Sequence, residues 1–430
     1  MSVSKLASLV APALLLLSAQ AVAATILTGD LAVLTVFADT YVTSGTNTQV
    51  LGNVTSGGVE TTGAGSRVVG NVISGGAANV GASIVGGSQT TVSVGGFIRS
   101  GGLATTGDAA IVKGDITASG ASNVGANAAV GGNVVSGDVS TAGANAKVVG
   151  NTTSVGHGTI GANAMVGGSM ASGGNATIGA KSAVGGDIKA AGIIMMEEKS
   201  SVGGSVSSVM PNGLQLKLSQ SPVPMNLTAN LTHAILEQVA SVALQVREAQ
   251  AKLTAMGPGT RIKTPVIFDL KLSPGIYSAP SLSTTAGTIL KLDGLGLNDQ
   301  TWVFNIEDIL AFGGTTTVEI VNSGKNGQVF WNVDKGYASA GDGANLVGTI
   351  FARDYIMIGA NTIVTSTENT CGGVYSRTSY VSTGANVIVG GAGCGKLPLS
   401  PPSDVPEPAT FGLMLAGLAL IGYKRRTVNK

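Results

Sequence analysis

The sequence has little charge, few aromatic side chains and almost no cysteine or histidine. Charged residues make up 11% and aromatic residues 4% of the 430 residues, whereas apolar residues reach 44%. Disordered chains are rich in charge and poor in apolar side chains, so this composition excludes a largely disordered chain. The 65 glycines follow no three-residue period, which excludes collagen. What remains is a chain of small side chains and many turns, as expected of many short strands.

The scarcity of charged and reactive groups also excludes several classes of function. The net charge is +1 without a basic stripe, so nothing supports nucleic-acid binding. The only histidines, His157 and His233, lie far in sequence from both cysteines, and we predict no metal site. No phosphate-binding loop or serine-histidine-aspartate arrangement is present, and the acidic residues are scattered. We therefore expect no enzyme activity and no cofactor.

The N-terminus predicts export. Lys5 precedes an apolar run from Leu6 to Leu17, and Ala21 and Ala23 supply the small residues of a cleavage site. This order is typical of a secretory signal peptide, here residues 1–24, that signal peptidase removes. A membrane helix is the alternative, but the apolar run is short for a span.

The C-terminus carries a second pattern that is typical of protein targeting. Pro406, Glu407 and Pro408 precede an apolar run from Phe411 to Tyr423, and Lys424-Arg425-Arg426 follows. This order resembles the PEP-CTERM sorting signal of Gram-negative bacteria, whose tail a membrane exosortase removes. The resemblance implies a linker over 396–404, a sorting tail over 405–430 that contacts the membrane before processing, and a cell-surface, outer-envelope or extracellular location. An ordinary tail anchor is the alternative, although about 13 apolar residues are few for a span of about 20.

The chain has two cysteines, Cys371 and Cys394, which are close together in sequence and far C-terminal to the export signal. In an oxidising compartment we expect them to form a disulfide that closes one loop. Two free thiols are the alternative.

Residues 43–208 repeat every 18 residues. Gly114-Asp115-Ile116, Gly132-Asn133-Val134 and Gly150-Asn151-Thr152 mark successive repeats, and one irregularity near 88–94 breaks the phase. Alternating apolar residues predict strands with one buried face, and Gly with Asn or Asp predicts the corners between them. Eighteen residues divide into three sides of about six, which predicts a triangular β-solenoid with one rung per repeat. Small residues are expected in its narrow interior, namely Ala128, Ala146 and Ala164.

The repeat length and the Gly-Asn/Asp-Ile/Val turns resemble those of bactofilins, which are β-solenoids that polymerise end to end. The resemblance concerns architecture, and it implies that end-to-end self-association is an available mode here. Asp and Asn at the corners are explained by turn chemistry rather than by calcium, because the Gly-rich calcium-binding nonapeptide is absent.

A long helix is predicted over Asn226–Met256, beyond the repeats. Apolar residues spaced three or four apart form one stripe, and Gly257-Pro258-Gly259 ends the pattern. The stripe is Leu231, Ile235, Val239, Val242, Val246, Ala249 and Leu253. Such a stripe must be covered, most simply by a flank of the solenoid.

The segment 260–395 returns to strands and carries a more specific resemblance. The motifs Leu272-Ser273-Pro274-Gly275-Ile276-Tyr277, Trp302-Val303-Phe304-Asn305-Ile306 and Gln328-Val329-Phe330-Trp331-Asn332-Val333 occur in that order. With the preceding helix they resemble the bacterial and fungal ice-binding-protein domain, and residues 25–42 resemble its first strands. The resemblance implies an all-β triangular β-solenoid with one long α-helix packed alongside. The repeat array is then an insertion that lengthens the solenoid, and both tryptophans are expected in the core.

In the resembling family, ice is bound by a flat solenoid face bearing short Thr, Ser, Ala and Asn side chains. The candidate contacts are Thr315, Thr317, Thr362, Thr365, Thr367 and Thr383, with Thr284 and Thr285 as weaker candidates. No strict Thr-x-Thr ladder recurs at rung spacing in this segment, and Thr is also common in strands for its own sake. The expected partner is an ice surface. The alternative is a structural adhesin or matrix scaffold associated with extracellular polysaccharide, without ice binding.

Overall fold

The structure is a computed structural model that describes residues 26–82, 92–209, 223, 226–266, 269–366, 372–391 and 394. The chain divides into two compact units, residues 1–396 and 397–430. Several predicted features lie outside the described residues: the signal peptide with Ala21 and Ala23, the sorting tail with Pro406, Glu407 and Pro408 and its short apolar helix, Thr367, and Cys371. Among the described residues, no helix is long and apolar enough to cross a membrane.

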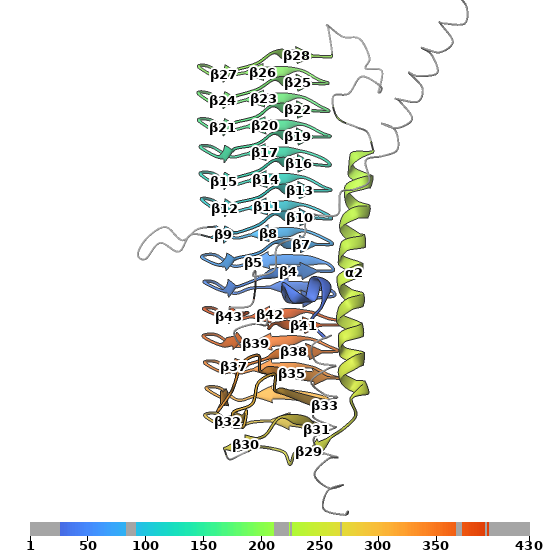
Figure 1. The fold of residues 1–430 in the computed structure, drawn as a ribbon. Helices are drawn as coiled ribbons and strands as arrows, with labels where there is room; N and C mark the ends of the chain where they lie inside the picture. The colour runs from blue at the N-terminus through green and yellow to red at the C-terminus, as the bar shows by residue number, and fades with distance from the viewer. Residues whose placement is uncertain are drawn as a thin grey trace, which may run out of the picture. The chain divides into compact units, whose positions relative to one another are not determined.

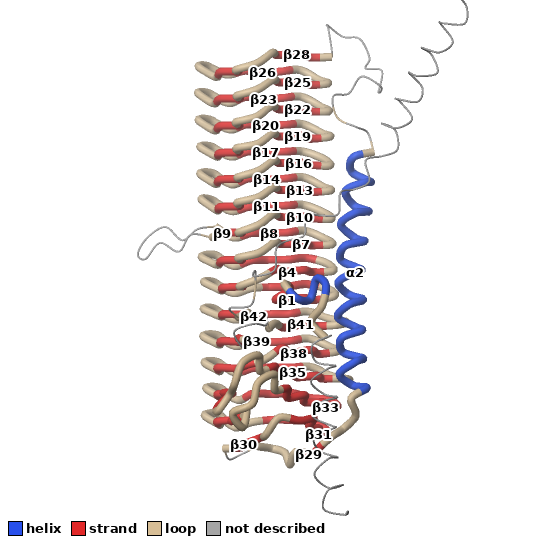
Figure 2. The backbone as a smooth tube through the Cα atoms, viewed as in Figure 1, coloured by secondary structure: helices blue, strands red, loops and turns tan. Residues whose placement is uncertain are grey.

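The first unit is a parallel β-solenoid, as predicted. Its described residues form one sheet of 28 strands and one of 15, stacked as three-sided rungs (Figures 1 and 2). A typical rung has β16 (Val134–Ser136) on what we call the first side, β17 (Ser140–Ala142) on the second and β18 (Lys147–Val148) on the third. The first two sides belong to the larger sheet and the third side is the smaller sheet.

The strands of each side follow one another in stacking order. Two long strands, β31 (Gly275–Ser283) and β33 (Thr301–Phe312), turn the corner and belong to both the first and the second side. The first side has β29 (Thr260–Arg261), β31, β33, β35 (Gln328–Val333), β38 (Thr349–Ala352), β41 (Val374–Ser376), β1 (Leu34–Ala38), β4 (Asn53–Ser56), β7 (Val72–Ser74), β10 (Ile98–Ser100), β13 (Ile116–Ala118), β16, β19 (Thr152–Ser154), β22 (Met170–Ser172), β25 (Ile188–Ala190) and β28 (Val206–Ser208).

The second side has β31, β33, β36 (Ala338–Ala340), β39 (Ile356–Ile358), β42 (Val381–Thr383), β2 (Tyr41–Thr43), β5 (Val59–Thr62), β8 (Ala78–Val80), β11 (Ala104–Thr106), β14 (Ser122–Val124), β17, β20 (Gly158–Ile160), β23 (Ala176–Ile178) and β26 (Ile194–Met196). The third side has β30 (Leu270–Leu272), β32 (Ile289–Asp293), β34 (Thr317–Val321), β37 (Asn345–Val347), β40 (Ile363–Thr365), β43 (Ile388–Val389), β3 (Gln49–Val50), β6 (Arg67–Val68), β9 (Ser93–Val94), β12 (Ile111–Val112), β15 (Ala129–Val130), β18, β21 (Met165–Val166), β24 (Ala183–Val184) and β27 (Ser201–Val202).

The register of the array follows the repeat of 18 residues. Ile116 pairs with Val134, and Val134 pairs with Thr152, so equivalent residues of successive repeats lie directly above one another. The offset departs from 18 between β7 and β10, where Val72 pairs with Ile98. The extra residues coincide with the irregularity predicted near 88–94. Before and after it, the strands pair with the regular offset of the repeat.

The two parts of the chain form one continuous solenoid. β1 pairs with β41 on one edge and with β4 on the other, so Val36 lies between Val374 and Val54. β2 and β3 join the second and third sides in the same way, to β42 and β43. The described part of the chain therefore starts in the middle of the stack, continues through the array to one end, and later runs from the other end back to the middle (Figure 1). We call the contact between β1–β3 and β41–β43 the joint.

The interior changes in character across the joint. In the array it is narrow, and Ala128, Ala146 and Ala164 are buried as predicted. In the segment 260–391 it holds large aromatic side chains, and Trp302 and Trp331 are fully buried, also as predicted. Trp331 stacks on Phe304 with ring centroids 4.0 Å apart. Both interiors are built from alternate residues of each strand, which face inward. One solenoid can therefore contain both kinds of interior.

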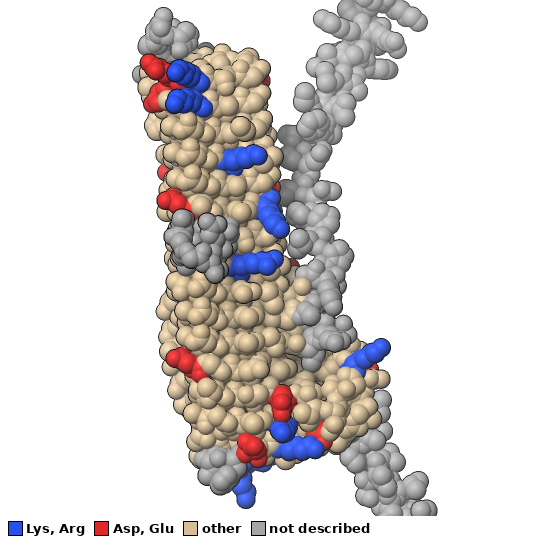
Figure 3. Space-filling view, turned by 90° about the vertical axis from the view of Figure 1, so that its left-hand side faces the viewer, with Lys and Arg blue, Asp and Glu red and all other residues tan. Residues whose placement is uncertain are grey.

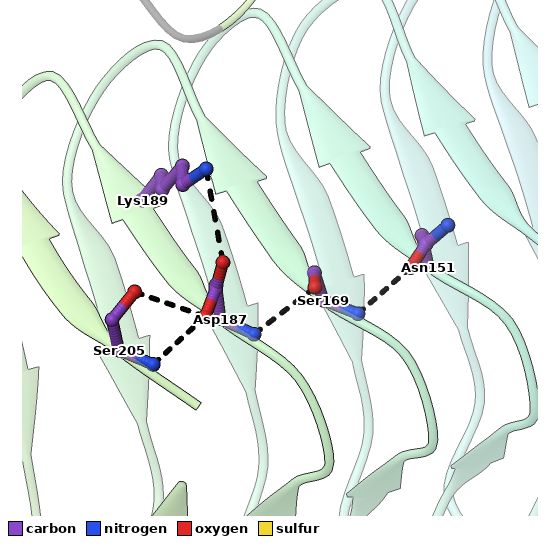
Figure 4. A network of polar contacts seen from close by, with 5 residues as sticks. All are labelled: Asn151, Ser169, Asp187, Lys189 and Ser205. Atoms are coloured by element: carbon purple, nitrogen blue, oxygen red, sulfur yellow. Dashed lines mark hydrogen bonds and ion pairs between the residues drawn. The ribbon is translucent and has the colours of Figure 1, made fainter. Parts of the chain in front are cut away.

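Polar side chains at the corners hydrogen-bond the backbone of the next rung. Figure 4 shows one such ladder, in which Asn151 Oδ1 accepts from the Ser169 amide at 2.8 Å. Ser169 Oγ accepts from the Asp187 amide at 3.0 Å, and Asp187 Oδ1 accepts from the Ser205 amide at 2.8 Å. These bonds satisfy amide groups where the strands are interrupted. They confirm that turn chemistry places Asn and Asp at the corners.

Helix α2 (Leu227–Ala255) lies along the first side, within one residue of its predicted bounds. The predicted stripe is buried except for the half-buried Leu231, and Gln250, which was not predicted, is buried with it. Near its start Thr228 Oγ1 donates to the Gly137 carbonyl at 2.7 Å, and near its end Gln250 Nε2 donates to the Val333 carbonyl at 2.7 Å. The helix packs on β7, β10, β33 and β35, so it spans the joint. Asp30, in the short 3-10 helix η1 (Gly29–Ala32), accepts a hydrogen bond from Gln245 of α2.

Candidate binding face

Two columns of side chains point outward from the second side, because alternate residues of a strand face opposite ways. The pairing register aligns them rung by rung. Column B, nearer the third side, contains Ser283, Ala311, Ser339, Met357, Ser382, Thr43, Thr61, Asn79, Thr105, Asn123, Thr141, Thr159, Thr177 and Met195. Column A, two residues earlier in each rung, contains Ser281, Ile309, Tyr337, Tyr355, Tyr380, Tyr41, Val59, Ala77, Leu103, Ala121, Val139, His157, Asn175 and Ile193.

Neither column contains a lysine, arginine, aspartate or glutamate in any of these described rungs. The other two sides differ. α2 covers much of the first side, and the third side exposes charged side chains such as Lys147, Arg67 and the ion pair of Lys291 with Glu319. Figure 3 views the molecule from the left of Figure 1, where third-side strands lie, and shows isolated charges there with groups near the two ends. The second side is therefore a long uncharged surface, which we call the uncharged face.

A continuous run of hydroxyl and amide side chains occupies the central part of column B. It covers nine successive rungs: Ser382, Thr43, Thr61, Asn79, Thr105, Asn123, Thr141, Thr159 and Thr177. All are partly or fully exposed. Adjacent strands in a sheet are about 4.7–4.9 Å apart, so these groups recur at that interval along the face. Threonine has a restricted χ1, which limits the positions of its hydroxyl and methyl groups.

Four tyrosines form a stacked ladder in column A across the joint. Tyr337 stacks on Tyr355 at 4.7 Å between ring centroids, Tyr355 on Tyr380 at 5.2 Å, and Tyr380 on Tyr41 at 4.7 Å. The interplanar angles are 11°, 8° and 5°. Because each inner ring has a neighbour on both faces, the ladder presents ring edges and hydroxyls rather than open ring faces.

The predicted contact residues do not gather on one face. Thr362 is fully buried and donates from Oγ1 to the Gly341 carbonyl at 3.0 Å, and Thr383 is only 7% exposed. The expectation that these two point outward is wrong. Thr383 faces inward with Val381 by the alternation of β42, and Thr362 lies directly before β40 with its side chain buried. Thr315 is an exposed corner residue with φ of 55°, and Thr317 and Thr365 lie on the third side. Among the weaker candidates, Thr284 Oγ1 lies 2.8 Å from the buried Thr316 Oγ1.

Most of the hydroxyl and amide column lies in the repeat array, whereas the predicted contact residues all lie in the segment after the helix. The signal is nevertheless present in the repeat: Thr105, Asn123, Thr141, Thr159 and Thr177 stand one repeat apart. Aligning the outward positions of the array would have found it. Its continuation to Thr43 and Ser382 depends on the joint, which the repeat does not reveal.

Of the two cysteines, Cys394 is described and is disulfide-bonded, while Cys371 lies outside the described residues. Cys394 Sγ lies 3.5 Å from Thr35 Oγ1, next to the joint. The C-terminal end of the described chain is thereby held against the first strand of the solenoid.

One carboxyl group is buried behind the uncharged face. Glu60 points inward from β5, is fully buried, and accepts a hydrogen bond from Thr62 Oγ1 at 2.6 Å. Its Oε2 atom has no hydrogen-bond partner among the described residues. Burial raises the pKa of Glu60 from 4.5 to about 8, and the bond from Thr62 opposes this only in part. The interior therefore favours the protonated, uncharged carboxyl.

Surface charges concentrate at the corner between the first and second sides of the later segment. Glu307 and Lys335 form an exposed ion pair at 2.6 Å, which lowers the pKa of Glu307 and raises that of Lys335. In the array the equivalent corner is mostly glycine, as at Gly75-Gly76 and Gly101-Gly102. Over the described residues, no three His, Cys, Asp or Glu side chains group as metal ligands would.

Fold and face together define a parallel β-solenoid with one flanking helix and one uncharged side. Residues 211–389 match the family model described as Ice-binding-like, and residues 404–427 match the PEP-CTERM protein-sorting motif. The segment after the repeat array is thus similar to an ice-binding-like domain, and the sorting motif that follows it indicates an exported protein. The resemblance of the array to bactofilins stays a prediction.

Several solved ice-binding proteins align with the chain at low identity. One from the Antarctic ascomycete Antarctomyces psychrotrophicus is 18% identical over 50% of this chain and 89% of its own, with a TM-score of 0.31. One from an Antarctic Flavobacteriaceae bacterium is 15% identical over 83% of this chain and 96% of its own, with a TM-score of 0.30. One from Shewanella frigidimarina is 18% identical over 50% and 89%, with a TM-score of 0.28. A search of curated proteins found no match.

Proposed function

We propose that this protein is an exported ice-binding protein that acts through the uncharged face and is processed by an exosortase. The observation that carries the proposal is the absence of Lys, Arg, Asp and Glu from both outward columns of the second side throughout the described rungs. The match of residues 211–389 to the ice-binding-like family supports ice as the partner.

The mechanism requires order rather than reactive groups. Charged side chains bind water strongly in orientations that do not fit an ice lattice, so a face without them can hold water in a regular array. Stacked strands fix the spacing of the outward groups at about 4.7–4.9 Å. α2 and the corner ladders stiffen the rungs, so little conformational entropy is lost when ordered water on the face joins a crystal. No covalent step or cofactor is involved.

The tyrosine ladder gives little support to the alternative of polysaccharide binding. Sugars stack on the open faces of aromatic rings, whereas Tyr355 and Tyr380 have both faces covered by neighbouring rings. The ladder fits a stiffening role at the joint. The ice-binding proposal is therefore favoured over the adhesin or scaffold.

Thermal hysteresis and ice-recrystallisation assays on the purified protein test the proposal. We expect activity in the wild type and a large loss in a variant that carries Thr43→Arg and Ser382→Arg, because two charges then stand in adjacent rungs at the centre of the face. The matched control carries Thr317→Arg and Asn345→Arg, which are paired in adjacent rungs of the third side, and it should keep its activity. A folded wild type without activity, or equal losses in both variants, would contradict the proposal.

A further inference from the structure

We infer that the ice-contacting surface lies mainly in the 18-residue repeat array, outside the segment that matches the ice-binding-like family. This inference rests on the proposed function and names the part of the uncharged face that performs it. It assigns a role to residues 43–177, which the family match does not reach.

The first argument is the continuity of the polar column. From Thr43 to Thr177 every rung places a Thr or Asn in column B, over eight successive rungs. In the later segment the same column contains Ser283, Ala311, Ser339 and Met357. Met357 is 46% exposed, and its long flexible side chain interrupts the regular row. An ordered water layer needs an unbroken row of short side chains. The unbroken row in the array is longer than the one in the later segment.

The second argument concerns the neighbouring column. Beside the array's polar column, four neighbours are small or short apolar side chains, namely Val59, Ala77, Ala121 and Val139, and the others are Tyr41, Leu103, His157 and Asn175. In the later segment the neighbours are the bulky rings of Tyr337, Tyr355 and Tyr380. Short side chains leave a flatter surface, and their methyl groups order water without binding it strongly.

The third argument concerns the corner beside the face. In the later segment this corner carries charged residues, including the exposed ion pair of Glu307 and Lys335. In the array the corner at Gly75-Gly76 and Gly101-Gly102 has no side chains, and each glycine amide bonds to the rung before it. A Cβ at Gly75 would meet the Gly57 carbonyl closer than real Cβ atoms come, so close stacking itself requires glycine there. Between residues 57 and 192 the described corners of this kind carry one charged residue, the exposed Asp138, so the uncharged surface of the array is wider except at that rung.

The array offers a matched test within single rungs. Thr159 and Thr153 belong to one rung, as do Thr177 and Ala171, but the first of each pair is on the second side and the other is on the first side. The face variant carries Thr159→Arg and Thr177→Arg, and the control carries Thr153→Arg and Ala171→Arg. All four positions are partly exposed, so each Arg can reach solvent without entering the core. A third variant, Ala311→Arg with Ser339→Arg, places charges on the face in the later segment.

A second series shortens the array by one rung. Deleting residues 155–172 joins Ser154 to Gly173 and keeps the register, because Ser154 and Ser172 are paired equivalents. The deletion leaves the contact of Thr228 with Gly137 in place. Circular dichroism and cooperative unfolding establish that each variant is folded before its activity is compared with wild type at equal concentration.

We expect the Thr159/Thr177 variant to lose most of its thermal hysteresis, its matched control to keep it, and the Ala311/Ser339 variant to lose less. The one-rung deletion should lose part of the activity. The inference is overturned if the wild type is active but the Thr159/Thr177 variant retains full activity, or if the Ala311/Ser339 variant alone abolishes it; the proposed function would survive either result. An inactive, folded wild type would overturn both.

Discussion

Tyr41 and Tyr380 stack with their ring centroids 4.7 Å apart and their planes 5° from parallel, although Tyr41 lies in β2 and Tyr380 directly precedes β42. The contact lies where β2 pairs with β42, so it joins the array to the family-matched segment on the uncharged face. The sequence around Tyr41 does not predict that Tyr380 is its partner, and the sequence around Tyr380 does not predict Tyr41.

Replacing Tyr380 should weaken the joint. Tyr380→Ala removes two stacked pairs, with Tyr41 and Tyr355, and each such pair contributes about 0.5–1.5 kcal/mol beyond its buried area. We expect a loss of about 1–3 kcal/mol in the free energy of unfolding, measured by urea titration. Tyr337→Ala is the control, since Tyr337 has one stacked partner in this ladder, and it should cost about half as much. Equal costs would argue against additive stacking in the ladder.

Stability should fall as the pH rises from about 4.5 to about 8. In the unfolded chain Glu60 ionises near 4.5, whereas burial raises its pKa in the folded protein to about 8. The folded state therefore binds the proton more tightly, and the stabilisation that is complete below the unfolded pKa is lost as the pH approaches the folded one. The total change is on the order of several kcal/mol.

Glu60→Gln supplies the test, with unfolding measured at pH 5 and pH 9. The variant cannot ionise, so its stability should depend less on pH over this range, and it should exceed wild type at pH 9. Asp187→Asn is a surface control, because the pKa of exposed Asp187 is instead lowered, chiefly by hydrogen bonds from Ser205. If Glu60→Gln keeps the wild-type pH dependence, the buried carboxyl is not its source.

Asn305 should anchor the end of the helix. Its Nδ2 donates to the Leu253 carbonyl at 3.0 Å, which also accepts from the Met256 amide, and to the Gly257 carbonyl at 2.9 Å, just beyond the end of α2. Asn305→Ala should destabilise the fold by about 1–3 kcal/mol. Asn345→Ala, on the exposed third side, should be nearly neutral in the same denaturant titration. A neutral Asn305→Ala would show that water replaces the side chain at these carbonyls.

Gly75→Ala should cost more than Gly102→Ala, although both glycines occupy the same corner of the array. A Cβ at Gly75 would collide with the Gly57 carbonyl, whereas at Gly102 the nearest backbone atom would be 3.2 Å away. We expect about 1–3 kcal/mol for the first substitution, as for other overpacked sites, and less for the second. Thermal unfolding of the two variants measures the difference. Similar melting temperatures would mean that the corner relaxes.

The repeat and the helix could be predicted because both are local periodic patterns. Successive rungs of the array pair residues 18 positions apart, so Ala128, Ala146 and Ala164 align in the sequence as they do in the core. The buried stripe of α2 follows from the spacing of residues such as Val239 and Val246, but Gln250 was missed because a polar side chain does not mark a buried position. In the buried position Gln250 Nε2 donates to the Val333 carbonyl, a contact that no sequence pattern indicates.

The candidate face could be predicted only in part. Thr362 lies directly before β40, and whether a residue at such a corner turns inward depends on the backbone of that corner. Thr383 faces inward because its neighbour in β42, Ser382, faces outward. The pairing of β1–β3 with β41–β43 joins residues more than 300 positions apart, and no sequence period connects them. Consequently Thr43 and Ser382 enter the polar column through tertiary structure alone.

The sequence by itself determined the rung: alternation chose which residues point inward, Gly and Asn placed the corners, and the constant repeat length aligned each rung with the next. The tertiary structure alone decided that the stack is continuous, that α2 covers the first side, and that the uncharged face crosses the joint. The physical reason is that hydrogen bonding between neighbouring strands repeats with the local chain, whereas the closure of the joint brings together two distant edges that carry no shared period.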